Sequence, residues 1–217
     1  MNLLKTTFFS GIFTAIRVLT GMVSIKIVAV YLGPTGVAFV GQFQSFLKIV
    51  NNASNLGIGQ GIIKYIAEFK ENENEYPKII STSIVITTVV TTIISILVLV
   101  FSSWLGEYMF KTNEYNFVFI VLALVLVFYS FGQIIATVLN GFKEIRKLLT
   151  ARIIGTLLGL GFTVTLVLMF NIKGALIALV LSQTLLFFIL FLFARKSKWF
   201  KIVNFVKGVD KKFLRLL

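Results

Sequence analysis

Three cations in the first 50 residues stand in segments that are otherwise apolar. They are Arg17, Lys26 and Lys48, and the first acidic residue of the chain is Glu68. A cation in the hydrocarbon of a bilayer costs roughly 2.5–3.5 kcal/mol on insertion scales, so it is normally found beside a partner charge, a water-filled cavity or a ligand. Because no acid lies nearby in the sequence, a phosphate is a candidate partner, and an acid from a second bundle is the alternative.

The spacing around Arg17 predicts that it faces a cavity or a neighbouring helix. Arg17, Thr20, Gly21 and Ser24 fall at i, i+3, i+4 and i+7, which gives one stripe of small and polar residues on a helix. Lys26 is nine positions from Arg17 and points to nearly the opposite face of an ideal helix. It is a candidate for the same anion, or it contacts a backbone carbonyl or extends to the membrane surface.

A second group of polar residues follows between positions 52 and 64. Asn52, Asn55 and Gly59 repeat at i, i+3 and i+7, and Gln60 and Lys64 repeat at i and i+4. Amides donate and accept hydrogen bonds and a cation attracts anions, so this ribbon suits sugar hydroxyls and phosphate oxygens, or else contacts between helices. The candidate substrate-binding residues are therefore Arg17, Lys26, Asn52, Asn55, Gln60 and Lys64.

The sequence has no signature of an enzyme, a cofactor or a metal site. It contains no cysteine and no histidine, which excludes disulfides, Cys/His metal centres and histidine acid–base chemistry. The eight acids fall in or near expected loops and the tail, and no phosphate-binding loop is present. Isolated amides in later expected spans, Gln133, Asn140 and Gln183, are interpreted as structural hydrogen-bonding groups.

Composition places the chain among polytopic membrane proteins with an all-α fold. Of its 217 residues 58% are hydrophobic and the mean hydropathy is +0.97, whereas soluble domains are about 45–50% apolar. A helix needs about 20 apolar residues to cross a bilayer. This length predicts six spans, at 8–32, 37–67, 79–105, 116–140, 149–170 and 174–194.

The second expected span is long and interrupted by polar residues and glycines. We expect it to bend or unwind between Asn51 and Gly61, which is tolerated in a membrane only where protein or a water cavity satisfies the backbone. The position of Lys48 relative to the membrane depends on this bend.

The distribution of lysine and arginine predicts the orientation. Most of the 21 cations fall in one alternating set of segments: the N-terminus, the loop after the second span, the group Lys143, Arg146, Lys147 and Arg152, and the tail. The opposite loops hold Lys111 and Lys173. Cytoplasmic loops carry the excess of cations, so both termini are expected in the cytoplasm.

The net charge of +13 is best explained by topology and by attraction to anionic headgroups, so the expected partner is the membrane and not nucleic acid. Residues 1–194 form the expected six-span unit. Residues 195–217 mix cations with aromatic and aliphatic residues, which is typical of an amphipathic helix on a membrane surface. A linker to a second half is an equally good interpretation.

Four segments in order resemble landmarks of the Wzx-type flippases, a polysaccharide-transporter family of the multidrug/oligosaccharidyl-lipid/polysaccharide exporter superfamily. They are MNLLK (1–5), VAVYLGPTG (28–36), GQGIIKYIAE (59–68) and LNGFK (139–143). The resemblance implies a non-enzymatic flippase of the bacterial inner membrane that moves an undecaprenyl-pyrophosphate-linked oligosaccharide, such as an O-antigen unit, by alternating access. It also implies a cationic central cavity that attracts the pyrophosphate, a role that suits Arg17, Lys26 and Lys64.

The chain departs from this family in length. Such transporters typically have two lobes, and this sequence has the six spans of an N-terminal lobe. We therefore expect a second lobe, from a second copy or a separate chain, and contact with other polysaccharide assembly proteins. The alternatives are an inactive half-transporter, a membrane scaffold, or a drug or cation antiporter. An antiporter would usually need a buried acid that the first spans lack.

Overall fold

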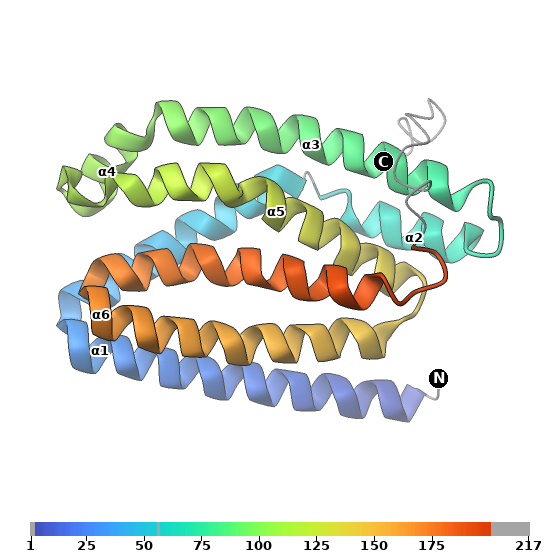
Figure 1. Ribbon diagram of the computed structural model, residues 1–217, viewed down its shortest axis with the longest axis horizontal. Helices are drawn as coiled ribbons and strands as arrows, with labels where there is room; N and C mark the ends of the chain where they lie inside the picture. Colours follow the sequence, from blue (N-terminus) through green and yellow to red (C-terminus); the bar gives the residue numbers. More distant parts are fainter. Residues whose placement is uncertain (1–2, 56, 201–217) are drawn as a thin grey trace.

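The computed structural model describes residues 3–55 and 57–200, and side chains from residue 7 onward. These residues form a helical bundle without a strand, as the composition predicts (Figure 1). The second part of the expected tail, residues 201–217, lies outside the described residues. In chain order the elements are α1 (Leu3–Asn55), α2 (Gly59–Phe69), α3 (Tyr76–Val100), α4 (Ser102–Phe110), the short 3₁₀ helix η1 (Asn113–Tyr115), α5 (Asn116–Gly141) and α6 (Ile145–Ala194).

The two longest helices, α1 and α6, are hairpins with a single non-helical residue at the turn. Gly33 has φ 65° and ψ −168°, and Asn171 has φ 51° and ψ −132°. Glycine and asparagine tolerate this left-handed region best, and Pro34 suits the first turn of the helix that follows Gly33. Each helix therefore has two antiparallel limbs (Figure 1), here called the first and second limb of α1 and of α6. Counting these limbs, long helical segments lie where the six spans are predicted. Four helices of the described residues, α1, α3, α5 together with η1, and α6, are long and apolar enough to cross a membrane.

The predicted break in the second span is also present. The second limb of α1 ends at Asn55, Gly57 has a φ of 70°, and α2 begins at Gly59. The third span differs from its prediction because α3 ends at Val100 and the chain continues as α4 after a bend at Phe101. Helix α4 carries Trp104 and Tyr108 as exposed side chains.

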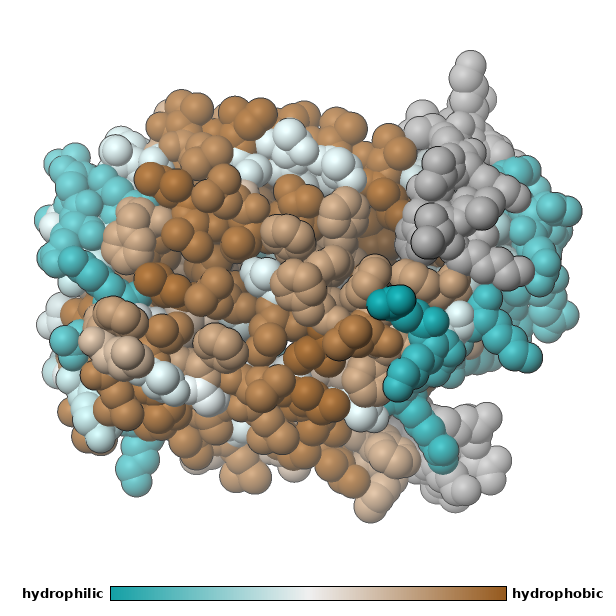
Figure 2. All heavy atoms as spheres, in the orientation of Figure 1, coloured by the Kyte–Doolittle hydropathy of each residue, from teal (hydrophilic) through white to brown (hydrophobic). Residues whose placement is uncertain are grey.

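The bundle has two polar ends separated by an apolar surface (Figure 2). The N-terminus, the α2–α3 and α5–α6 connections and the end of α6 lie together at one end, here called the basic end (Figure 1). The turns at Gly33 and Asn171 and the segment around η1 lie at the opposite end. This is the alternation of loops that six spans require.

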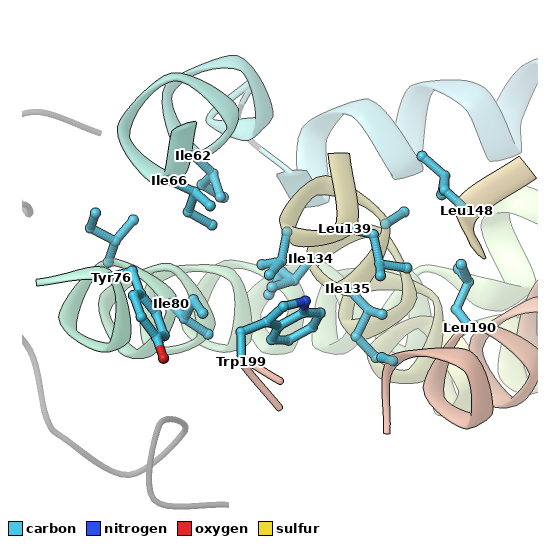
Figure 3. Packing of buried hydrophobic residues seen from close by; sticks show 14 of the residues in the cluster. Ile62, Ile66, Tyr76, Ile80, Ile134, Ile135, Leu139, Leu148, Leu190 and Trp199 are labelled. Carbon is cyan, nitrogen blue, oxygen red and sulfur yellow. The ribbon is translucent and has the colours of Figure 1, made fainter. Parts of the chain in front are cut away.

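Two apolar clusters hold the helices together. One lies toward the basic end and includes Ile62, Ile66, Ile80, Leu139 and Leu190, several of which are completely buried (Figure 3). The other packs the second limb of α1 against α5 and the second limb of α6. It centres on Phe43, Phe119, Leu122, Leu126 and Leu176. Burial of each such side chain contributes about 1.5–3 kcal/mol in water; within a membrane, close packing replaces this hydrophobic term.

Residues Arg195–Phe200 fold back over the basic end. Trp199 is 4% exposed and stacks on Phe142, with ring centres 5.5 Å apart and an angle of 3° between the ring planes. Lys147 Nζ lies 2.8 Å from Glu144 Oε2 and donates a hydrogen bond of 2.8 Å to Ser197 Oγ. These contacts connect the two ends of α6 beside the basic end.

The turn of α6 gives a stability prediction. A Cβ atom on Gly174 would lie 1.8 Å from the backbone carbonyl oxygen of Leu166, so the two limbs meet only because position 174 has no side chain. Gly174→Ala should therefore separate the limbs and lower stability by about 1–3 kcal/mol, seen as a lower melting temperature in detergent. Gly161→Ala is the matched control, because open space surrounds that position. Equal melting temperatures for the two variants would contradict the packing described.

Candidate functional site

A cavity of about 740 Å³ lies between the two limbs of α1, helix α5 and the two limbs of α6. Its volume falls within the range of about 300–1,000 Å³ that small-molecule sites usually have. The described lining contains two arginines and no aspartate or glutamate. Its polar members are Arg17, Thr20, Ser24, Gln44, Tyr129, Gln133, Arg152, Thr156, Thr163, Ser182 and Gln183.

The first limb of α1 contributes the stripe that contains Arg17. Arg17, Thr20, Gly21 and Ser24 all line the cavity, which is one of the two surroundings that their spacing allows. The Thr20 hydroxyl donates to the carbonyl of Ile16 at 2.8 Å, so its own hydrogen is satisfied within the helix. The Arg17 side chain remains exposed to the cavity. No described acid forms an ion pair with its guanidinium.

Arg152 is the second cation of the cavity, although it follows Lys143, Arg146 and Lys147 in the group of cations that predicts the orientation. Helix α6 begins at Ile145, which places Arg152 about two turns inside the helix. There it lines the cavity together with Arg17 and with Tyr129 of α5. A signal was present in the sequence, because Arg152, Gly155, Gly159 and Thr163 repeat the pattern of a cation followed by small and polar residues on one face.

Amides from three different segments complete the lining. They are Gln44 on the second limb of α1, Gln133 on α5 and Gln183 on the second limb of α6. Asn51 donates from Nδ2 to Gln183 Oε1 at 3.3 Å, and Asn51 is 9% exposed. The interpretation of Gln133 and Gln183 as purely structural groups is therefore incomplete, because both also face the cavity.

The other five candidates from the sequence do not line this cavity. Lys26, Asn52, Gln60 and Lys64 are exposed elsewhere, and Asn55 donates from Nδ2 to the backbone carbonyl of Asn51 at 2.6 Å. The Lys64 ammonium lies 5.3 Å from the ring centre of Tyr65. The structure therefore brings Arg17 together with residues outside the predicted set.

The helical register also assigns a face to Lys48. Gln44, Lys48, Asn51 and Asn55 follow at i, i+4, i+7 and i+11, within one continuous limb of α1. Gln44 lines the cavity and Asn51 bonds to a residue that lines it. Lys48 thus stands on the same side of this limb, between the cavity and the basic end.

This arrangement is suited to binding an anion that also carries hydroxyl groups. A guanidinium presents planar donors that match phosphate oxygens in pairs, and amides bond to hydroxyls as donors and acceptors. The described lining offers no carboxylate, histidine or cysteine for proton transfer or nucleophilic attack. The described residues also contain no group of side chains able to hold a metal ion.

Comparisons with known proteins find one family and two curated relatives. A family model described as polysaccharide biosynthesis protein matches residues 3–217. The chain is 22% identical over 159 residues to the lipid III flippases of Escherichia coli (strain K12) and Shigella flexneri. That match covers 73% of this chain and 38% of the length of each relative. No solved structure matches the chain.

The two arginines give a prediction about stability without ligand. Because two like charges line one cavity whose described lining contains no acid, Arg17→Gln or Arg152→Gln should raise the melting temperature by about 2–4 °C. The double variant should gain little more, since either substitution removes the same repulsion. Arg146→Gln is the matched control, because Arg146 lies over the ring of Phe9 and outside the cavity. A loss of stability in both single variants would show that the arginines have partners that the described residues do not include.

Proposed function

We propose that this chain, which belongs to the polysaccharide biosynthesis protein family, is one lobe of a transporter for lipid-linked glycans. The observation that carries the proposal is the pair Arg17 and Arg152 in one polar cavity with no acid in its described lining. A cavity of this kind inside a membrane bundle attracts anions and repels free cations. The protein then acts as a carrier and breaks no bond.

The proposed substrate is an undecaprenyl-pyrophosphate-linked oligosaccharide, such as an O-antigen unit. A pyrophosphate offers several oxygens to the two guanidinium groups, and charge-assisted hydrogen bonds of this kind are roughly twice as strong as neutral ones. The name of the two relatives, lipid III flippase, supports a lipid as the carried molecule. The resemblance to Wzx-type flippases supports the glycan.

The amides and hydroxyls of the cavity would hold the sugar part loosely. Gln44, Gln133 and Gln183 come from three segments and so surround the space beside the arginines. When a sugar hydroxyl exchanges its hydrogen bond with water for one with such a group, the free energy of binding changes by only about 0.5–1.5 kcal/mol. Weak contacts suit a carrier, because the sugar must leave on the other side.

The proposed setting is the bacterial inner membrane, with both termini in the cytoplasm. The basic end would face the cytoplasm, where short loops carry the excess of lysine and arginine. The turns at Gly33 and Asn171 would then lie on the periplasmic side.

A second lobe is part of the proposal. Alternating access by rocking needs two bundles around one site, and the match spans 38% of each curated relative. The second bundle would come from a second copy or from a separate chain. It would cover the exposed side of Arg17 and close the cavity.

Loss of either cavity arginine should stop glycan export. In a strain that depends on this gene, Arg17→Ala and Arg152→Ala should each lower surface glycan tenfold or more, since each removes a charge-assisted contact to phosphate. The measurement is glycan per cell at matched membrane abundance of the protein. Lys26→Ala tests the candidate outside the cavity and should have a much smaller effect.

Arg146→Ala is the matched control for these variants, because it removes an arginine of the basic end that does not line the cavity. Export that survives loss of both Arg17 and Arg152 would reject the proposed anion site. An equal fall in surface glycan in the two cavity variants, in Lys26→Ala and in Arg146→Ala would point instead to a general requirement for positive charge.

The orientation can be tested by thiol labelling, because the chain has no native cysteine. Glu71→Cys places a thiol at the basic end, and Lys173→Cys places one at the opposite end. In spheroplasts a membrane-impermeant maleimide should label position 173 directly and position 71 only after permeabilisation. The reverse pattern would overturn the proposed topology.

A further inference from the structure

A second hollow, of about 490 Å³, lies between α3, α5 and the second limb of α6. Its described walls are apolar except for one cation, and include Ile84, Phe131, Ile135, Phe187, Phe191 and Arg195. Ile135 is 6% exposed and belongs to the apolar cluster near the basic end (Figure 3). We call this hollow the α3/α5/α6 groove.

The groove and the arginine cavity lie on different faces of α6. Gln183 and Leu186 line the cavity, whereas Phe187, Phe191 and Arg195 follow at i, i+4 and i+8 along the groove. The two hollows share no described lining residue. A molecule whose headgroup occupies the cavity is therefore separated from this groove by the helix itself.

Close contact between backbones fixes the shape of the groove. A Cβ atom on Gly132 would lie 3.2 Å from both Cα and Cβ of Phe187, so α5 and α6 touch at this glycine. Phe131 and Phe187, the neighbours at this contact, both line the groove. The hollow is thus formed by packed helices, and a guest would enter a site that already exists.

Arg195 gives the groove a polar end. It stands at the C-terminus of α6 on the basic end, is exposed, and its Cζ lies 5.9 Å from the ring centre of Phe191. In the described part of the chain no carboxylate pairs with it. An apolar channel that ends in a cation at the edge of the bundle matches a molecule with a hydrocarbon chain and an anionic headgroup.

We propose that the α3/α5/α6 groove binds a phospholipid with a net negative headgroup, its acyl chain against Phe131 and Phe187 and its phosphate on Arg195. The bilayer around the bundle supplies such a lipid. The site is separate from the transported substrate, because the arginine cavity lies on another face of α6. Phosphate oxygens accept paired hydrogen bonds from the guanidinium, and the net charge of the headgroup selects it over a zwitterionic lipid.

Native mass spectrometry of the full chain in detergent tests the proposal. The probes are phosphatidylglycerol and phosphatidylcholine with the same acyl chains. One equivalent of phosphatidylglycerol should bind with higher affinity than phosphatidylcholine does. Arg195→Gln should weaken the binding of that equivalent about fivefold, which is the effect expected for one cation at an anionic headgroup. Arg146→Gln, which removes another arginine of the basic end that lies over a phenylalanine ring, should leave it unchanged.

A crosslinking experiment locates the acyl chain of the bound lipid. Phosphatidylglycerol with a diazirine on its acyl chain should crosslink to peptides around Phe131 and Phe187, and Ile84→Phe, which fills the groove, should remove that product. Equal binding of both lipids, equal effects of Arg195→Gln and Arg146→Gln, or crosslinks spread evenly over the apolar surface would overturn the proposal. Such results would mean that the groove is filled by bilayer lipids without selection or is covered by another protein segment.

Discussion

Hydrocarbon offers no water to a backbone amide or carbonyl, and the architecture of this bundle follows from that constraint. In the described part of the chain the long apolar segments are helical, and the chain reverses inside α1 and α6 at one residue each, Gly33 and Asn171. Several hydroxyl side chains obey the same constraint. Ser83 and Thr88 donate to carbonyls four residues earlier, at 2.7 Å in each case, and Thr91 bonds to Ser130 across the α3–α5 contact at 2.9 Å.

The hydrocarbon of the bilayer also limits where charged side chains can lie. Arg17 and Arg152 lie within helices of the bundle, and both line the polar cavity between α1, α5 and α6. Like charges that line one cavity repel each other, so we expect both arginines to lower the stability of the protein without ligand, as groups in binding sites often do. An anion that enters the cavity removes this repulsion and is attracted by both groups. The attraction of the cavity for anions and the expected loss of stability thus have the same cause, which is two positive charges in one cavity.

Periodicity along single helices was enough to predict most of the fold. The six spans, the break near Gly57 and the stripe around Arg17 all depend on local pattern, which a sequence displays directly. Arg152 was missed because its depth depends on where α6 begins, and the loop of cations before it hides that start. Lys26 and Gln60 resemble binding residues in type, but the face that each presents is decided by packing between distant segments.

A double-mutant cycle on ligand binding shows whether Arg17 and Arg152 hold one pyrophosphate together. The ligand is a short-chain polyprenyl pyrophosphate, with the polyprenyl alcohol as control, and the proteins are the unaltered chain, the two single glutamine variants and the double variant. If both arginines bind the same pyrophosphate, the coupling free energy between the two substitutions should exceed about 0.5 kcal/mol for the pyrophosphate and be absent for the alcohol. Strictly additive losses of binding free energy in the double variant, or equal binding of the two ligands, would contradict a shared pyrophosphate.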